Sequence, residues 1–438
     1  MLAKARALVI AALAGTLALG LAPAQGAQSP ELQLRRVFEA LREGRRPAAL
    51  EEADRLVAQH PNFRLAHLVR GDLLLARVRT IEGLGNAGNG ARERLEDLRA
   101  EAAARLLAAR EPPPPGRVPR YLLQSSPSER HAVVVDAHHS RVYVYENTNG
   151  ALRLVEDFYA SIGRNGIEKE REGDRKTPIG VYQVTSHIAG KKLPDLYGWG
   201  AFPLSYPNEW DRIRGRTGYG IWIHGVPADT YARAPQASDG CIALANPEIE
   251  QLATRVHPGT TPVVIARRIE WVPPETLRAE RDALLRQLDA WRTDWESRDS
   301  VRYLGHYARR FRSDGMDLQA WSAHKRRANA AKSWIKVQLA GVSVYRDPGR
   351  QDMIVVTFDQ DYRSSNLSQR SRKRQYWIVE DGRWKIAYEA PVSRPVLLLP
   401  ESFRAATAGA AARGARAAPR KDGKSGSEGR RPVTTSTR

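Results

Sequence analysis

The sequence predicts a multidomain α+β protein with a helical N-terminal unit, a mostly-β middle domain and an α+β C-terminal domain. Apolar residues recur at helical spacing over residues 31–110, the pattern of amphipathic helices. From residue 131 the period changes to two, as in strands, and beyond residue 273 a helical pattern is followed by several strand patterns. The length of 438 residues fits three folded units, since a domain usually has about 100 to 200 residues.

The domain boundaries are predicted from changes in composition along the chain. We expect a signal peptide at 1–27, a helical domain at 28–111, a proline-rich linker at 112–120, a mostly-β domain at 121–270, an α+β domain at 275–392 and a disordered basic tail at 402–438. The linker is expected to be stiff because it contains a run of prolines. The tail has almost no large apolar side chains and cannot bury enough surface to fold.

The first residues have the organisation of a secretory signal peptide. Lys4 and Arg6 precede an apolar run at 7–21, and a small-residue run at 22–24 follows. This order is typical of exported proteins, with an uncleaved membrane anchor as the alternative. We therefore expect the protein in the periplasm or cell envelope, with membrane contact only through this segment or through weak electrostatics.

The formal net charge of +20 indicates an anionic partner. Nucleic acid and an anionic matrix, such as a cell wall or a membrane surface, both fit this charge. Because the N-terminus predicts export, we expect no nucleic-acid partner.

Residues 28–111 are expected to form paired helices. Leu34, Val37 and Leu41 fall at helical spacing, and Pro61-Asn62 interrupts a later run of the same kind. One pair faintly resembles a tetratricopeptide-like repeat, which cannot bury its apolar face as a single unit. Two roles stay open, a plain helical cap and a docking or dimerisation module. A homodimer through this unit or the C-terminal domain is therefore one hypothesis.

Two features of the middle domain invite a functional interpretation. His138 and His139 lie at a predicted hairpin turn, but no third ligand is evident beside them, so we expect no metal site.

Residues 191–220 are rich in aromatic residues, Gly and Pro, and long segments of this kind are usually functional. We interpret this segment as a lid, with a hydrophobic flap over a sheet edge as the alternative.

The candidate catalytic residues are Cys241 and His224. Cys241 is the only cysteine, and Gly240 before it allows a tight turn whose backbone N–H groups could stabilise an oxyanion. His224 lies 17 positions upstream (241 − 224), at the end of a predicted strand. A Cys–His pair on such supports performs acyl transfer. The alternative is a small buried cysteine and an unrelated core histidine.

The residues around this pair resemble the signature of the L,D-transpeptidase family, the YkuD-type catalytic domain. The matching runs are His224-Gly225 and Ser238-Asp239-Gly240-Cys241 with Asn246 beyond, and Lys176-Thr177-Pro178 upstream matches a second recurrent run. The resemblance implies that Cys241 is the nucleophile, His224 the base and the Gly225 carbonyl the group that orients the imidazole. It also implies that peptidoglycan stem peptides are the substrate and that no cofactor is needed.

The chain departs from the family pattern at Asp239 and Ala243, where many cross-linking relatives carry His and Arg. An arginine suits a substrate carboxylate, so we expect Lys176, Arg214 or Arg216 to take that role here. Trp222 and Asn246 are further candidates for substrate contact. The Asp/Ala variant resembles the subgroup that trims stem peptides.

The C-terminal domain resembles the NTF2-like fold, with a helical pair predicted over 277–311 and a strand meander after it. It contains no cluster that marks a second active site, so an accessory role is expected. The order of the three domains resembles the cell-shape L,D-carboxypeptidases. The sequence therefore predicts stem-peptide acyl transfer, with carboxypeptidase trimming of tetrapeptide to tripeptide as one alternative and a non-catalytic wall-binding scaffold as the other.

Overall fold

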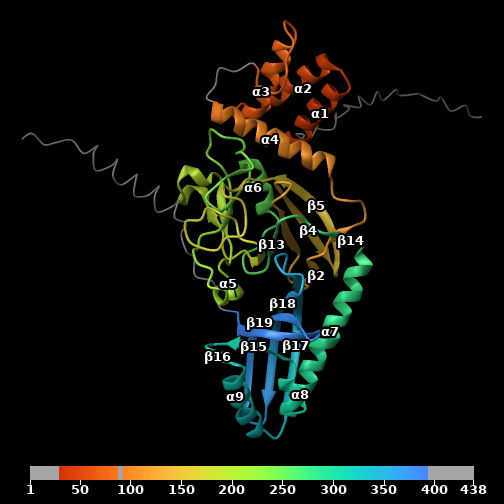
Figure 1. The fold of residues 1–438 in the computed structure, drawn as a ribbon, viewed down its shortest axis with the longest axis vertical. Helices are drawn as coiled ribbons and strands as arrows, with labels where there is room; N and C mark the ends of the chain where they lie inside the picture. Colours follow the sequence, from red (N-terminus) through yellow and green to blue (C-terminus); the bar gives the residue numbers. More distant parts are fainter. Residues whose placement is uncertain (1–28, 87–91, 393–438) are drawn as a thin grey trace, which may run out of the picture.

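The computed structural model describes residues 29–86 and 92–392, which form three units along the long axis of the molecule (Figure 1). The helical unit lies at one end, the mostly-β unit in the middle and the α+β unit at the other end. The expected signal peptide at 1–27 and basic tail at 402–438 lie outside the described residues. Within the described ranges, no helix has the length and apolar character needed to cross a bilayer.

The N-terminal unit is helical, as predicted. It contains α1 (Pro30–Arg42), α2 (Arg46–Gln59), α3 (Arg64–Leu75) and α4 (Arg92–Arg110). α1 begins where the Ser29 hydroxyl accepts a hydrogen bond from the Leu32 N–H at 3.2 Å. Apolar faces of the helices share one core, which includes Leu34, Val37, Leu56 and Val69. α4 lies between the other helices and the middle unit (Figure 1).

The middle unit is built on a five-stranded sheet with the order β5-β4-β3-β13-β7. Its strands are β3 (His131–Asp136), β4 (Arg141–Thr148), β5 (Ala151–Tyr159), β7 (Gly180–Gln183) and β13 (Pro262–Ala266). β3 and β13 run parallel to each other, and every residue in both is buried. Valine-rich runs of this kind suit central strands that are covered on both faces.

A second sheet carries the candidate site. Its order is β12-β10-β9-β8, from β8 (Ile188–Ala189), β9 (Gly200–Pro203), β10 (Trp222–His224) and β12 (Ile242–Ala243). Beside it lie the ladder of β6 (Ile162–Gly163) with β11 (Gln236–Ser238), and α6 (Asn246–Ala253), which follows β12. Apolar residues of both sheets share one core that includes Val133, Val263, Ile223 and Ile242.

The segment 191–220, interpreted as a lid or flap, is folded into the domain. It contains the end of η1 (Gly190–Lys192), η2 (Asp195–Tyr197), β9 and α5 (Glu209–Ile213). Its aromatic residues Tyr197, Phe202 and Tyr206 are no more than 4% exposed. Because these three side chains belong to the hydrophobic core, this part of the segment is packed into the domain.

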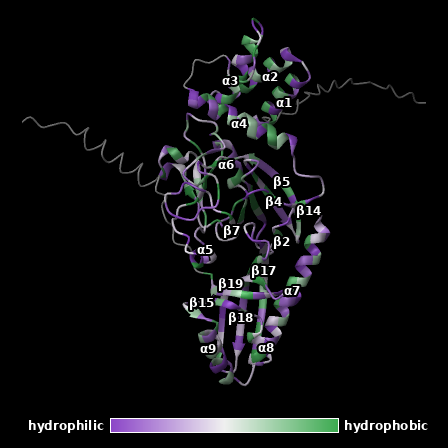
Figure 2. Cartoon of the chain, viewed as in Figure 1, coloured by the Kyte–Doolittle hydropathy of each residue, from purple (hydrophilic) through white to green (hydrophobic). Residues whose placement is uncertain are grey.

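The C-terminal unit has a seven-stranded sheet with the order β16-β15-β20-β19-β18-β17-β2. Its elements are α7 (Pro274–Glu296), α8 (Ser300–Leu304), β15 (Tyr307–Ser313), β16 (Met316–Asp317), α9 (Leu318–Ala330), β17 (Ile335–Arg346), β18 (Met353–Ser364), β19 (Leu367–Glu380) and β20 (Arg383–Pro391). α7 runs along the sheet, with hydrophilic and hydrophobic residues interspersed over its length (Figures 1 and 2).

The helical pair predicted over 277–311 is shorter in the structure. Helix α8 ends at Leu304, and the residues from Tyr307 form β15, in which Arg309 and Arg310 are exposed while Phe311 is buried. The spacing of the buried aromatic residues fits a helical period in the sequence. In the structure, however, these residues lie on a strand that pairs with β20. Helix α9 had no counterpart among the predicted elements.

The middle and C-terminal units share a strand and a core. β2 (Leu122–Gln124), which the sequence places in the mostly-β domain, pairs with β17 of the C-terminal sheet. β1 (Val118–Pro119) pairs with β14 (Trp271–Val272) at the junction. Alternate residues of β18 face opposite sides, and Met353 and Val355 pack with residues of the middle unit such as Val134. The two units therefore hold each other in a fixed relation.

Candidate active site

Two short parallel strands bring His224 and Cys241 into the same pocket. β10 ends at His224, and β12 begins directly after Cys241, with Ile223 opposite Ile242. Both residues line a narrow pocket of about 100 Å³, and both are buried, His224 with 3% and Cys241 with 6% of its surface exposed. The structure therefore places these two residues at the same pocket.

The turn before the thiol depends on Gly240. Its φ is +118°, and a Cβ there would lie 2.7 Å from the Lys176 carbonyl oxygen, so only glycine fits. The Thr177 hydroxyl donates to the Gly240 carbonyl oxygen at 2.9 Å and accepts from the Gly163 N–H at 2.9 Å. The upstream Lys176-Thr177-Pro178 run thus supports the turn that carries Cys241.

Ser238 organises the same turn from the other side. Its hydroxyl donates to the Cys241 carbonyl oxygen at 2.6 Å and accepts from the Gly240 N–H at 3.1 Å. From the sequence, the N–H groups of both Gly240 and Cys241 are expected to stabilise an oxyanion. Because the Gly240 N–H is already bonded to Ser238, the Cys241 N–H is the candidate of the two.

The His224 imidazole is oriented by a backbone carbonyl. Its Nδ1 lies 2.6 Å from the Gly225 oxygen, and a carbonyl oxygen only accepts, so Nδ1 carries the proton. Nε2 therefore has the lone pair that a general base needs. The ring is also packed by Tyr197, with ring centroids 4.9 Å apart. The role that the resemblance implies for Gly225 agrees with this geometry.

Burial favours the neutral form of both groups. It raises the pKa of the Cys241 thiol to about 11 and lowers the pKa of His224 to about 3, with the positive charge of Arg233 also lowering that of His224. The thiol donates to the Gly220 carbonyl oxygen at 3.4 Å. These shifts favour a neutral thiol and a neutral imidazole over a thiolate–imidazolium pair.

The pocket also contains basic side chains that the sequence analysis did not single out. Arg164 and Arg233 both line it. Asp239 pairs with Arg164 at 3.1 Å and with Arg175 at 3.8 Å. Arg233 Nη2 donates to the Leu196 carbonyl oxygen at 3.1 Å, and among the described residues no carboxylate lies within 4 Å of its guanidinium. Arg233 is thus the pocket cation best placed for an incoming anion.

The basic residues proposed for substrate binding lie elsewhere. Arg214 and Arg216 line a separate cavity with Asp211 and Asp347, and Arg216 is paired with Asp211 at 3.1 Å. Lys176 contributes its backbone to the Gly240 turn, and its side chain does not line the pocket. Arg214 and Arg216 follow α5, whose Trp210 and Asp211 line the same separate cavity, and the linear sequence does not show this placement.

The remaining two candidates have supporting positions. Trp222 is 1% exposed and packs in one cluster with Tyr197 and Cys241. The Asn246 side chain accepts from the Trp199 N–H at 2.9 Å and donates to the Val226 carbonyl oxygen at 2.8 Å. Asn246 thus ties the chain after Gly225 to α6, and neither residue lines the pocket.

His138 and His139 do have a third polar neighbour. Glu111, at the end of α4, lies with them in one cluster, and its carboxylate is 3.1 Å from His139 Nε2. Arg268 donates to the same Glu111 oxygen at 2.9 Å, and Asp136 is 2.9 Å from His139 Nδ1. The Arg268 guanidinium supplies positive charge to this cluster. The cluster connects the helical unit to the middle sheet.

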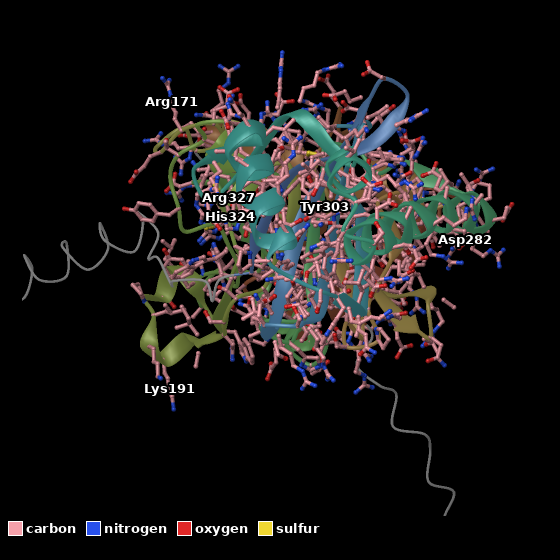
Figure 3. All side chains as sticks on the ribbon, turned by 90° about the horizontal axis from the view of Figure 1, so that it is seen from below. Arg171, Lys191, Asp282, Tyr303, His324 and Arg327 are labelled. Carbon is pink, nitrogen blue, oxygen red and sulfur yellow. The ribbon has the colours of Figure 1, made fainter. Side chains whose placement is uncertain are left out.

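The interior of the C-terminal unit holds a second group of buried charges. Lys325 on α9 lies over the rings of Trp321 and Trp295, at 4.3 and 4.9 Å, and Lys373 bonds Glu389 at 2.7 Å. Burial lowers the pKa of Lys325 to about 8. Figure 3 shows Tyr303 inside this unit and His324 and Arg327 on α9, whereas Arg171 and Lys191 extend from the middle unit.

The pocket has the arrangement typical of a cysteine acyl-transfer fold, a buried thiol and an imidazole that is oriented by a backbone carbonyl. Residues 129–265 match the model of the L,D-transpeptidase catalytic domain (YkuD), and residues 283–390 match that of the Cds6 C-terminal NTF2-like domain. The chain therefore contains an L,D-transpeptidase catalytic domain followed by an NTF2-like domain. Both predicted resemblances and the predicted fold class are confirmed.

Solved structures extend the likeness across both domains. Bd1075 of Bdellovibrio bacteriovorus is 29% identical, with a TM-score of 0.56 over 64% of this chain and 99% of that one. Pgp2 of Campylobacter jejuni, described as a helical cell shape determining protein, is 26% identical, with a TM-score of 0.53 over 62% of this chain and 95% of that one.

Curated relatives match over a shorter stretch. YafK of Escherichia coli (strain K12), whose name places it among the L,D-transpeptidases, is 32% identical over 84 residues, or 19% of this chain. The chain spans 29% of the length of the curated relatives it matches.

Proposed function

We propose that this protein is a cysteine acyl transferase that acts on peptidoglycan stem peptides outside the cytoplasm. The observation that carries the proposal is the joint burial of Cys241 and His224 in one pocket, with the imidazole fixed by the Gly225 carbonyl. The L,D-transpeptidase domain at residues 129–265 supports the substrate class. The signal-peptide pattern at the N-terminus supports localisation in the periplasm or cell envelope.

The first half-reaction forms a thioester. The thiol proton moves to His224 Nε2 as Sγ attacks the carbonyl carbon of the residue that precedes the terminal D-Ala. The Cys241 N–H stabilises the resulting oxyanion. Collapse of this intermediate breaks the peptide bond, and the departing D-Ala amine takes the proton back from the imidazolium.

The second half-reaction depends on the acceptor. Water, activated by His224, would give a tripeptide and regenerate the thiol, whereas an amine of a second stem peptide would give a cross-link. Asp239 and Ala243 replace residues that cross-linking relatives often carry. The likeness to Pgp2, described as a cell shape determining protein, points in the same direction. We therefore favour hydrolysis of tetrapeptide to tripeptide as the principal reaction.

Arg233 takes the role that the sequence analysis assigned to Lys176, Arg214 or Arg216. Its guanidinium lines the Cys241 pocket and has a carbonyl but no carboxylate as its polar partner within the described residues. Planar guanidinium groups bind carboxylates through two parallel hydrogen bonds. The carboxylate of the terminal D-Ala is a matching group because it lies next to the bond that is cut.

The test is incubation of the purified protein with a disaccharide tetrapeptide, with products identified by mass spectrometry. Tripeptide and free D-Ala as the main products would support the carboxypeptidase reaction. Abundant dimers joined through their stem peptides would show instead that an amine reaches the thioester. If neither product forms and a carbapenem-type acylating agent fails to block thiol labelling, the wall-binding scaffold replaces the enzyme.

A further inference from the structure

The helical unit lies outside both family matches, yet it contacts the loop that follows His224. This loop, residues 226–235, leads from His224 to β11 and carries Arg233 to the pocket. It contains no helix or strand, so contacts from neighbouring elements have to hold its side chains in place.

The first contact comes from the turn between α2 and α3. The Tyr231 ring stacks on the Phe63 ring with centroids 4.3 Å apart, and both residues are buried. The Tyr231 N–H donates to the Asn62 carbonyl oxygen at 3.2 Å, and Asn62 Nδ2 donates to the Ala228 carbonyl oxygen at 3.2 Å. The helical unit thus fixes the loop at two points on the N-terminal side of Arg233.

The second contact reaches the backbone of Arg233 through Tyr159. The Tyr159 hydroxyl donates to the Arg233 carbonyl oxygen at 2.9 Å. The Tyr159 ring is covered by Arg105 of α4, whose guanidinium carbon lies 4.0 Å from the ring centroid. Arg105 is itself held by Glu101 at 2.8 Å, and both side chains are 3% exposed. Buried, hydrogen-bonded groups of this kind are rigid supports.

We infer that the helical unit acts as a positioning domain for the active site, holding Arg233 where its guanidinium meets the carboxylate of the bound peptide. Asn62 and Phe63 are positioning residues in this arrangement, because they touch the loop and not the pocket. The part of the inference that concerns the carboxylate rests on the proposed function. The part that concerns the placement of Arg233 does not, because the charge of Arg233 is also sensed by the Cys241 thiol.

The thiol offers a readout that needs no substrate. Arg233 and Lys169 lower the pKa of Cys241, Asp239 raises it, and His224 lines the same pocket. Lys169 is held by Asp174 at 2.7 Å and Asp239 by Arg164 at 3.1 Å, through contacts that do not involve the helical unit. A rise in the pKa of the thiol after a change at Phe63 or Asn62 is therefore expected to act through Arg233.

The experiment compares Phe63→Ala, Asn62→Ala, Arg233→Ala and the double variant Phe63→Ala/Arg233→Ala in the full chain. We expect Arg233→Ala to raise KM for the disaccharide tetrapeptide by about ten- to a hundredfold, as for a lost charged hydrogen bond. Phe63→Ala and Asn62→Ala should raise KM by about three- to tenfold with a smaller change in kcat. In the double variant, Phe63→Ala should add less than about twofold, because the two changes act through one group.

The same variants are titrated by iodoacetamide labelling of Cys241, which tests the placement of Arg233 without turnover. Arg233→Ala, Phe63→Ala and Asn62→Ala should each move the labelling profile to higher pH. Arg64→Ala is the matched control, since Arg64 forms an exposed ion pair with Asp229 at the same interface, and such pairs contribute little.

Thermal unfolding identifies any variant that loses its fold, and Asn62→Ala, which removes only a partly exposed hydrogen bond, keeps the test valid if Phe63→Ala unfolds. Wild-type KM and labelling in folded Phe63→Ala and Asn62→Ala, beside an impaired Arg233→Ala, would overturn the inference. So would additive effects in the double variant. If the wild-type protein has no turnover, the proposed function fails, but the labelling profiles still decide this inference.

Discussion

The Nδ1 atom of His224 lies 2.6 Å from the carbonyl oxygen of Gly225. A carboxylate in this position would stabilise an imidazolium, whereas a carbonyl fixes the tautomer and ring orientation without adding a full negative charge. The contact with Gly225 raises the pKa of His224, but burial and the positive charge of Arg233 outweigh it and lower this pKa to about 3. The base is therefore ready to accept a proton as soon as the thiol is turned toward it.

Replacing Cys241 with alanine should abolish turnover and leave the fold intact. Cys241 supplies the only thiol in the chain, and alanine fits the same small buried volume. Release of D-Ala from purified muropeptides measures the effect, with circular dichroism as the control for folding. Residual activity above about a tenth of the wild-type rate would contradict the assignment of the nucleophile.

Replacing His224 with glutamine should slow thioester formation by about a hundred- to ten-thousandfold, the usual contribution of general-base catalysis. Glutamine keeps polar atoms in the pocket but cannot take the thiol proton. Rapid-mixing acylation by a carbapenem-type agent, followed by mass spectrometry, measures this step alone. An unchanged acylation rate would show that another group accepts the proton.

Labelling of Cys241 by iodoacetamide should increase with pH throughout the neutral range. Burial raises the pKa of the thiol to about 11, so the thiolate fraction rises about tenfold per pH unit below that value. The labelling rate is measured at intervals of about one pH unit from about pH 6 to about pH 10. A plateau already reached near neutral pH would indicate a resting thiolate–imidazolium pair instead.

Replacing Thr177 with valine should reduce both stability and acylation. Valine has nearly the same shape but leaves the Gly240 carbonyl oxygen and the Gly163 N–H without the Thr177 hydroxyl, at a cost of about 1–3 kcal/mol. The acylation rate should fall because the Gly240 turn loses its support. Thr177→Ser retains the hydroxyl and is the matched control, so equal loss in both variants would argue against this role.

Replacing Lys325 with methionine should stabilise the protein at pH 7 and remove part of its pH dependence. Burial lowers the pKa of Lys325 to about 8 in the folded state, below its ordinary value of 10.5. The folded state then binds fewer protons than the unfolded state between these values, so this lysine makes stability rise as pH increases through that window. The free-energy cost of burying the charged Lys325 ammonium is fully present below about pH 8.

Guanidinium unfolding of the wild type and Lys325→Met from pH 7 to pH 10.5 measures this difference, because the titrations of groups that do not interact with Lys325 cancel between the two proteins. The difference in unfolding free energy between Lys325→Met and the wild type should become smaller as the pH increases. A lower stability of Lys325→Met at every pH would mean that contacts with Trp295 and Trp321 outweigh the desolvation of the ammonium.

The sequence alone predicted Cys241 and His224 as the reactive pair and indicated the order of the domains. Cys241 and His224 lie within short runs whose local requirements, a glycine before the thiol and a strand before the histidine, are visible in neighbouring residues. The domain order was visible because helices and strands leave different periods in the pattern of apolar residues. Both signals are local, and a linear sequence records local signals directly.

Only the tertiary structure decided which basic residues reach the pocket and what holds Arg233 there. Arg233 had no motif to mark it, and its position depends on Asn62 and Phe63, more than a hundred residues earlier in the chain. Arg216, a better candidate from sequence, is turned away by its ion pair with Asp211. Likewise, β2 belongs to the C-terminal sheet because it pairs with β17, which lies far from it in the sequence. Long-range packing determines which of several chemically similar side chains reaches a site, and no local pattern in the sequence records this outcome.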